Sequence, residues 1–138
     1  MAVLKELRAF MIYKSFDRKP YIKLYVCIRM LSLKDILEIN KQFSEGRVVN
    51  KSSLEYVVKT QARSKNWLRT TAAFTRAILI DHPFEDGNKR TAANVIMLLL
   101  EMNNIEFNAE KVSSVVIDIT KKNLTSLREI ERHINHGI

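Results

Sequence analysis

The sequence predicts an all-α fold, and three observations lead to that prediction. Apolar residues recur with the period of a helix that buries one face through most of the chain after residue 30. Only three glycines and two prolines occur in 138 residues, too few for the many tight turns of a β-sandwich or β-barrel. The composition, 46% apolar and 28% charged, is that of a folded globular protein. We therefore expect a bundle of about six helices.

The first helices of this bundle are expected between residues 32 and 80. One begins at Leu33, with Ser32 as its N-cap, and ends at Gly46. Residues 46–52 then form a short, extended-looking interruption that contains two adjacent valines. The helices that follow it in this half of the chain are expected at 54–62 and 66–80.

The second half of the chain is expected to contain three more helices. Residues 88–102 are apolar on nearly all sides, so this helix should be central and buried. Asn108 is placed to cap the next helix, which continues to about residue 120. Ser126 and Glu129 have the spacing of a capping box and would open a last helix that ends near the C-terminus.

Residues 1–30 differ from the rest and are expected to form a basic appendix to a main domain at 31–138. From Tyr21 to Met30 apolar side chains alternate with others, as in a half-buried strand. The segment before it fits either a helix or the first strand of a hairpin. The net charge is +8, and the appendix contributes seven basic and two acidic side chains to it. The main domain is therefore only mildly basic.

The sequence also excludes several classes of protein. Its longest unbroken apolar run, Val95–Leu100, is far too short to span a membrane. The N-terminal residues include Lys5, Glu6 and Arg8 and do not have the layout of a secretory signal. The single cysteine, Cys27, cannot form an intrachain disulfide, which suits a reducing compartment. We therefore expect a cytoplasmic protein without a membrane partner.

The most informative stretch is DHPFEDGNKRTA at 81–92, which leads from the end of one helix into the most buried one. A helix N-terminus attracts anions because its first N–H groups are free and it carries a partial positive charge. Gly87 allows the backbone to approach a ligand closely. Lys89 and Arg90 place two cations where the helix dipole disfavours them, and a bound polyphosphate would account for that cost.

Two other side chains of this loop suggest transfer of a group to a hydroxyl. The imidazole of His82 can accept a proton at neutral pH. Asp86 stands beside the anion site, where a carboxylate is a natural ligand of Mg²⁺, which favours one or two carboxylates plus phosphate oxygens. A base, a metal ligand and a phosphate site this close together point to transfer of a phosphorus centre.

The same stretch resembles the signature of the Fic/Doc (Fido) family, H-x-F-x-(D/E)-G-N-G-R-x-x-R. The positions that match are His82, Phe84, Asp86, Gly87, Asn88 and Arg90. Lys89 and Ala93 depart from the Fic pattern in the manner of the Doc, or "death on curing", branch, whose second half reads N-K-R-T-A. The resemblance covers about residues 31–138 and implies the helical bundle of that family, with a short β-like flap ahead of the motif.

The resemblance also implies a role for each matching position. His82 would be the general base for the acceptor hydroxyl, Phe84 would anchor the loop in the core, and Asp86 would bind Mg²⁺. The phosphates of ATP would be held by Gly87, Asn88, Lys89 and Arg90. The flap, whose backbone pairs with the target protein in this family, would consist of Arg47, Val48, Val49 and Asn50.

The transferred group is either phosphate or AMP. Fic enzymes with the full motif transfer AMP, whereas a lysine at the position of Lys89 accompanies transfer of the terminal phosphate in the Doc branch. We expect Doc-like phosphoryl transfer, with adenylylation as the alternative. The resemblance further implies a toxin that is restrained by a separate antitoxin protein and acts on a component of translation.

Two alternatives come from other functional classes. The basic appendix could contact nucleic acid through Lys14, Arg18, Lys19 and Lys23. That hypothesis gives no reason for the His82–Arg90 constellation, so we do not expect a nucleic-acid partner. Alternatively, a scaffold protein could retain the fold with an inert loop.

Overall fold

The computed structural model describes residues 30–64 and 66–138, and the predictions for residues 1–29 lie outside this part of the chain. Within it the chain forms six α-helices, one short 3-10 helix (η1) and no strand, which confirms the all-α prediction for the described residues. The elements are, in chain order, α3 (Leu33–Lys41), α4 (Ser52–Thr60), η1 (Gln61–Arg63), α5 (Trp67–Leu79), α6 (Asn88–Met102), α7 (Ala109–Lys122) and α8 (Leu127–Gly137).

Three of these helices begin at a side chain that caps them. Ser32 Oγ accepts a hydrogen bond from Asp35 N at 3.1 Å, and Asp35 Oδ2 accepts one from Ser32 N at 2.9 Å, so α3 has a complete capping box. Asn66 and Asn108 each accept hydrogen bonds from two backbone N–H groups in the first turns of α5 and α7. The predicted caps at Ser32 and Asn108 are confirmed.

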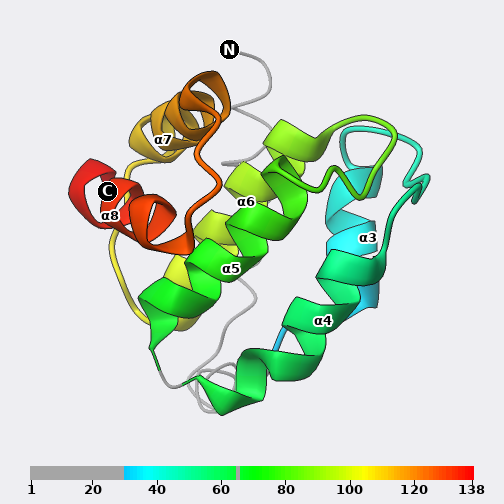
Figure 1. The fold of residues 1–138 in the computed structure, drawn as a ribbon, viewed down its shortest axis with the longest axis horizontal. Helices are drawn as coiled ribbons and strands as arrows, with labels where there is room; N and C mark the ends of the chain where they lie inside the picture. The colour runs from blue at the N-terminus through cyan, green and yellow to red at the C-terminus, as the bar shows by residue number, and fades with distance from the viewer. Residues whose placement is uncertain (1–29, 65) are drawn as a thin grey trace.

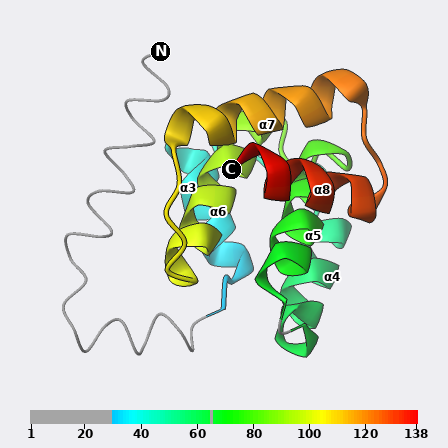
Figure 2. The ribbon, with the colours of Figure 1, turned by 90° about the vertical axis from the view of Figure 1, so that its left-hand side faces the viewer.

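Helices α5 and α6 lie side by side at the centre of the molecule, with α3 and α4 on one flank and α7 and α8 on the other (Figure 1). Helix α6 packs against α3, α5 and α7, and every residue from Thr91 to Met97 is buried. This confirms that the helix at 88–102 is central. Figure 2 shows α7 lying across one end of the bundle, where its last turn approaches the start of α6.

The predicted end of the first helix is wrong. Helix α3 ends at Lys41 rather than at Gly46. After Lys41 the N–H groups of Phe43 and Ser44 both donate to the carbonyl of Asn40, each at 2.9 Å, and form a turn that follows the helix. This turn sends residues 42–46 across the end of α3 and toward the loop that precedes α6.

The predicted capping box at the start of α8 is also wrong. Ser126 does precede the helix, but its side chain makes no capping hydrogen bond. Ile130 and Ile134, one turn apart on α8, are fully buried against the rest of the bundle. Burial of this apolar face therefore stabilises the helix without a side-chain cap.

The interruption between α3 and α4 is partly extended, as the sequence predicts for 46–52. Among the described residues its one regular pairing is an antiparallel bridge between Val48 and Phe84. The bridge joins this segment to the loop at 81–87, which leads into α6.

None of the helices in the described ranges has the length and apolar character needed to cross a membrane.

Candidate active-site pocket at the start of helix α6

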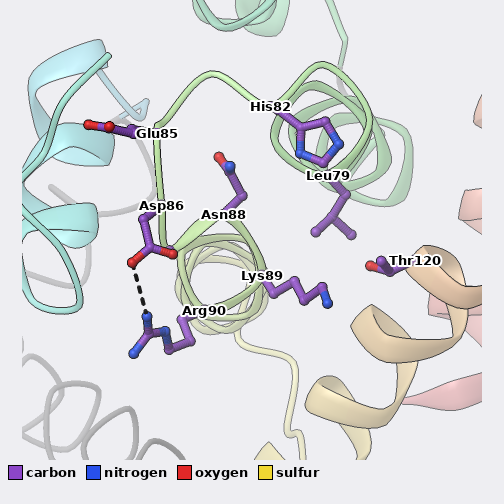
Figure 3. A pocket seen from close by; sticks show the side chains of 9 residues that line it. Leu79, His82, Glu85, Asp86, Asn88, Lys89, Arg90 and Thr120 are labelled. Carbon is purple, nitrogen blue, oxygen red and sulfur yellow. Dashed lines mark ion pairs between the residues drawn. The ribbon is translucent and has the colours of Figure 1, made fainter. Parts of the chain in front are cut away.

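A cavity of about 300 Å³ lies where α5 ends, α6 begins and α7 ends (Figure 3). Its lining consists of Leu79, His82, Glu85, Asp86, Gly87, Asn88, Lys89, Arg90 and Thr120. Every residue that the sequence assigns to a base, metal or phosphate role is in this set. Phe84 and the predicted flap are not part of the lining, although Phe84 belongs to the loop that forms it and the flap is bridged to that loop.

The first turn of α6 offers backbone N–H groups to the pocket. Its N-cap is Gly87, which has no side chain that could accept a hydrogen bond from the first N–H groups of the helix. The first N–H of the helix with a backbone partner is that of Thr91, which donates to the carbonyl of Gly87 at 2.9 Å. The N–H groups of residues 88–90 have no such partner in the described part of the chain, and no acidic side chain occupies this turn. The turn can therefore bind an anion.

Gly87 occupies a position that suits only glycine. Its φ of 79° lies in the left-handed region, where a side chain is disfavoured. A Cβ at this position would lie 3.1 Å from Asn40 Nδ2 and 3.3 Å from Ser44 Cβ. The backbone of the loop therefore rests directly on the end of α3, and both the torsion angle and the space require glycine.

Asn88 holds the loop in place through its side chain. Its Oδ1 accepts a hydrogen bond from the N–H of Phe84 at 3.1 Å, and its Nδ2 donates to the carbonyl of Phe84 at 2.9 Å. The side chain of Phe84 is only 2% exposed and lies in the core, where the sequence predicts a loop anchor. One N–H of the side-chain amide is thus engaged with Phe84, and the backbone N–H of Asn88 has no backbone partner among the described residues and can contact an anion.

Asp86 and Arg90 face each other on one side of the first turn of α6, with 3.9 Å between Asp86 Oδ2 and Arg90 Nη2 (Figure 3). The guanidinium carbon of Arg90 also lies 5.7 Å from the ring centroid of Phe43, at the end of α3. These two partners orient Arg90. The side chain of Asp86 is 73% exposed, so its carboxylate stays open to solvent and to a cation.

Lys89 and His82 lie on the opposite side of Asn88 (Figure 3). Lys89 extends toward Thr120 of α7 and makes no ion pair with a described residue. His82 is exposed, and its φ of 45° is a left-handed conformation that histidine adopts more readily than most residues. Its ring has no hydrogen-bond partner in the described ranges, which leaves a ring nitrogen able to accept a proton at the pocket.

The predicted flap lies against the pocket loop. The N–H groups of Val49 and Asn50 donate to the carbonyl of Pro83 at 2.8 and 3.2 Å. The N–H of Glu85 donates to the carbonyl of Arg47 at 3.0 Å, and the side chains of these two residues form an ion pair at 3.5 Å. The inner edge of the flap is therefore occupied by the residues on either side of Phe84.

The outer edge of the flap remains free. Backbone groups of an extended segment alternate between its two sides, so the N–H and carbonyl of Val48 point away from the loop. Neither group makes a backbone hydrogen bond to a described residue. The side chains of Val48 and Val49 are 37% and 66% exposed, which is unusual for valine.

The acidic residues of the pocket limit how it could hold a metal. In residues 30–64 and 66–138 no group of three or more His, Cys, Asp or Glu side chains is arranged to bind an ion. Of the two carboxylates in the lining, that of Glu85 is paired with Arg47 at 3.5 Å, and that of Asp86 has a longer contact of 3.9 Å with Arg90 and is 73% exposed. One carboxylate fits Mg²⁺ that is held mainly by phosphate oxygens and water.

Four residues at the site have no signal that sequence reasoning detected: Asn40, Phe43, Leu79 and Thr120. Asn40 and Phe43 contact the loop and Arg90 from the end of α3, and Leu79 and Thr120 form the far wall of the pocket. Their residue types are common ones, and only the packing of α3, α5 and α7 around α6 brings them to the site.

In comparison with known proteins, the chain matches no protein-family model, no curated protein and no solved structure.

Proposed function

We propose that this protein is an ATP-dependent transferase of the Fic/Doc type that moves the terminal phosphate of ATP onto a hydroxyl side chain of another protein. One observation carries the proposal. His82, Asp86 and two basic residues line a single pocket at a helix N-terminus whose N–H groups are free. The resemblance of residues 82–90 to the family motif and the helical fold support the same assignment.

In this proposal the first turn of α6 binds the phosphates. The free N–H groups of residues 88–90 would donate to phosphate oxygens, Arg90 would fork two oxygens, and Lys89 would act as a point charge. Asp86 would hold Mg²⁺, which would neutralise part of the phosphate charge. A bound polyphosphate would also offset the cost of two cations at the positive end of the helix dipole.

His82 would act as the general base. Its ring nitrogen would take the proton of the acceptor hydroxyl while the hydroxyl oxygen forms a bond to the γ-phosphorus. The bond between that phosphorus and the β–γ bridging oxygen would break, and ADP would leave with the electron pair. The proton on His82 would then pass to solvent, which its exposed position allows.

The flap would bind the target backbone along its free outer edge. The unpaired N–H and carbonyl of Val48 can form backbone hydrogen bonds with one strand of the target. Val48 and Val49 present exposed apolar side chains beside that edge. Since the inner edge is bonded to Pro83, next to His82, a docked strand would lie close to the base.

From the resemblance of residues 82–90 to the Fic/Doc motif we also propose a cytoplasmic toxin of a toxin–antitoxin pair, with a component of translation as its target.

The test is a transfer assay with Mg²⁺, a cell extract and ATP labelled at either the α- or the γ-phosphate. We expect a protein band labelled from γ-labelled ATP only. His82→Ala should reduce labelling by about 100-fold or more, because a general base contributes about that factor. The matched control is His136→Ala, which changes an exposed histidine of α8 outside the pocket and should label like the wild type.

The other outcomes identify the alternatives. Labelling from α-labelled ATP would make the protein an AMP transferase and would show that Lys89 does not select the terminal phosphate. If neither label is transferred and Arg90→Ala leaves ATP binding unchanged, the transferase proposal fails. Salt-sensitive binding of nucleic acid by the intact chain would then support the binder hypothesis.

A further inference from the structure

Asn40, on the last turn of α3, is hydrogen-bonded to the pocket loop. Its side chain is fully buried, and its Nδ2 donates both to the backbone carbonyl of Asp86 and to Thr91 Oγ1, each at 3.0 Å. It thereby spans the two ends of the turn that contains Gly87. The same Nδ2 is the nearest atom to the face of Gly87 that a Cβ would occupy.

The orientation of this amide follows from its partners. A backbone carbonyl can only accept, so the atom that faces Asp86 must be the nitrogen. This leaves Asn40 Oδ1 buried without a hydrogen-bond partner. A buried unpaired oxygen destabilises a folded protein. An apolar side chain of similar volume would avoid that cost, but it would lose both hydrogen bonds to the turn.

We propose that Asn40 is a positioning residue for the phosphate-binding turn of α6. By holding the carbonyl of Asp86 and the hydroxyl of Thr91 together, it fixes the left-handed turn at Gly87, which directs the free N–H groups into the pocket. This inference rests on the proposed function, because it assigns Asn40 to the binding of nucleotide phosphates. Asn40 itself does not line the pocket and would not touch the nucleotide.

Asn40 acts on one part of the loop only. The segment around Pro83, next to His82, is held separately by the flap through Val49 and Asn50. Loss of Asn40 should therefore disturb the phosphate-binding turn more than the base. The expected result is weaker binding of ATP with a smaller change in the rate at saturating ATP.

Asn94, on α6, provides a matched control. It is also fully buried, but neither of its side-chain polar atoms has a hydrogen-bond partner, so it makes no hydrogen bond to the loop. The experiment compares Asn40→Leu and Asn40→Ala with Asn94→Leu and Asn94→Ala. Each variant is measured for Mg–ATP affinity, for the KM and kcat of transfer, for its thermal midpoint and for amide hydrogen exchange.

The Asn40 variants should bind Mg–ATP about tenfold more weakly, the factor that corresponds to about 1.4 kcal/mol. Their KM for ATP should rise by about the same factor, while kcat falls by less than about threefold. The amide of Thr91, which is hydrogen-bonded to the carbonyl of Gly87 across the turn, should exchange faster. The Asn94 variants should change neither affinity nor this exchange.

Three results would overturn the inference. The first is unchanged ATP affinity in both folded Asn40 variants. The second is an equal loss of affinity in the Asn94 variants, which would mean that any disturbance of the core has this effect. The third is unchanged exchange at Thr91, a measurement that requires no nucleotide. If the wild type binds no Mg–ATP, the proposed function fails, and the same exchange data still decide whether Asn40 holds the turn.

Discussion

The start of α6 differs from the starts of the other described helices. Ser32, Asn66 and Asn108 cap α3, α5 and α7 with their side chains. Helices α4 and α8 lack such a cap, but each carries a glutamate in its first turn, Glu55 or Glu129, which suits the helix dipole. Among the described α-helices, α6 alone has neither a side-chain cap nor an acid in its first turn, and it has two cations there instead.

This difference indicates that the start of α6 is less stabilised by side-chain caps and first-turn charges than the other α-helix starts. A capped helix start is stabilised by about 1 kcal/mol relative to an uncapped one. Helix α6 is the central helix of the bundle, and burial of its apolar residues stabilises it without a cap. The free N–H groups at its start are then available to a ligand. The largest effects of substitution on nucleotide binding should therefore be found at α6, and substitutions at the other starts should change stability only.

The largest effect is expected from Lys89→Glu. The change removes a cation from the proposed phosphate site and adds a repelling charge, so Mg–ATP affinity should fall by about 100-fold or more. Since an acid in the first turn suits the dipole, the free energy of unfolding should rise by about 0.5 kcal/mol. Titration calorimetry and chemical denaturation of the same samples measure the two effects.

The control for this change is Lys111→Glu in the first turn of α7, whose start is capped by Asn108. It reverses the same charge at a helix start that lies outside the pocket lining. Its effect on stability should resemble that of Lys89→Glu, and its ATP affinity should equal that of the wild type. An equal loss of affinity in both variants would mean that net charge, and not the pocket, binds the nucleotide.

A smaller effect is expected from Asn88→Ala. It removes the two hydrogen bonds to the backbone of Phe84, at about 1 kcal/mol each, so the free energy of unfolding should fall by about 2 kcal/mol. ATP affinity should fall by about tenfold because the loop loses its clamp. Asn103→Ala, at the other end of α6, removes one hydrogen bond to Leu99 and should not alter affinity. Unchanged affinity in Asn88→Ala would mean that the loop keeps its conformation without the clamp.

Much of the fold could be predicted because its signals are local. The caps at Ser32 and Asn108 and the apolar run of α6 depend on residues within a few positions of one another, and the structure confirms them. The end of α3 and the capping box of α8 were predicted wrongly, although α8 does begin after Ser126 as expected. Burial of Ile130 stabilises the start of α8 without the cap, and this burial depends on tertiary packing.

The candidate site divides in the same way. The residues of the loop could be predicted because they are consecutive, and the pocket contains the whole set from Asp86 to Arg90. Asn40 and Thr120 could not, because they reach the site from α3 and α7, which are separated from it by many residues. The hydrogen bonds between the side-chain amide of Asn88 and the backbone of Phe84 could also not be predicted from the sequence.

The smallest effect, and the one that completes the comparison, is expected from Asn108→Ala. The change removes the hydrogen bonds to the N–H groups of Glu110 and Lys111, so the free energy of unfolding should fall by about 1 kcal/mol. ATP affinity should not change, because the start of α7 lies outside the pocket and only its last turn contributes Thr120. Asn108→Ser should restore most of the stability, since serine caps nearly as well. A loss of affinity in Asn108→Ala that Asn108→Ser reverses would mean that the position of α7 controls the pocket. The capped helix starts would then affect ligand binding as well as stability, and the contrast with the open start of α6 would be wrong.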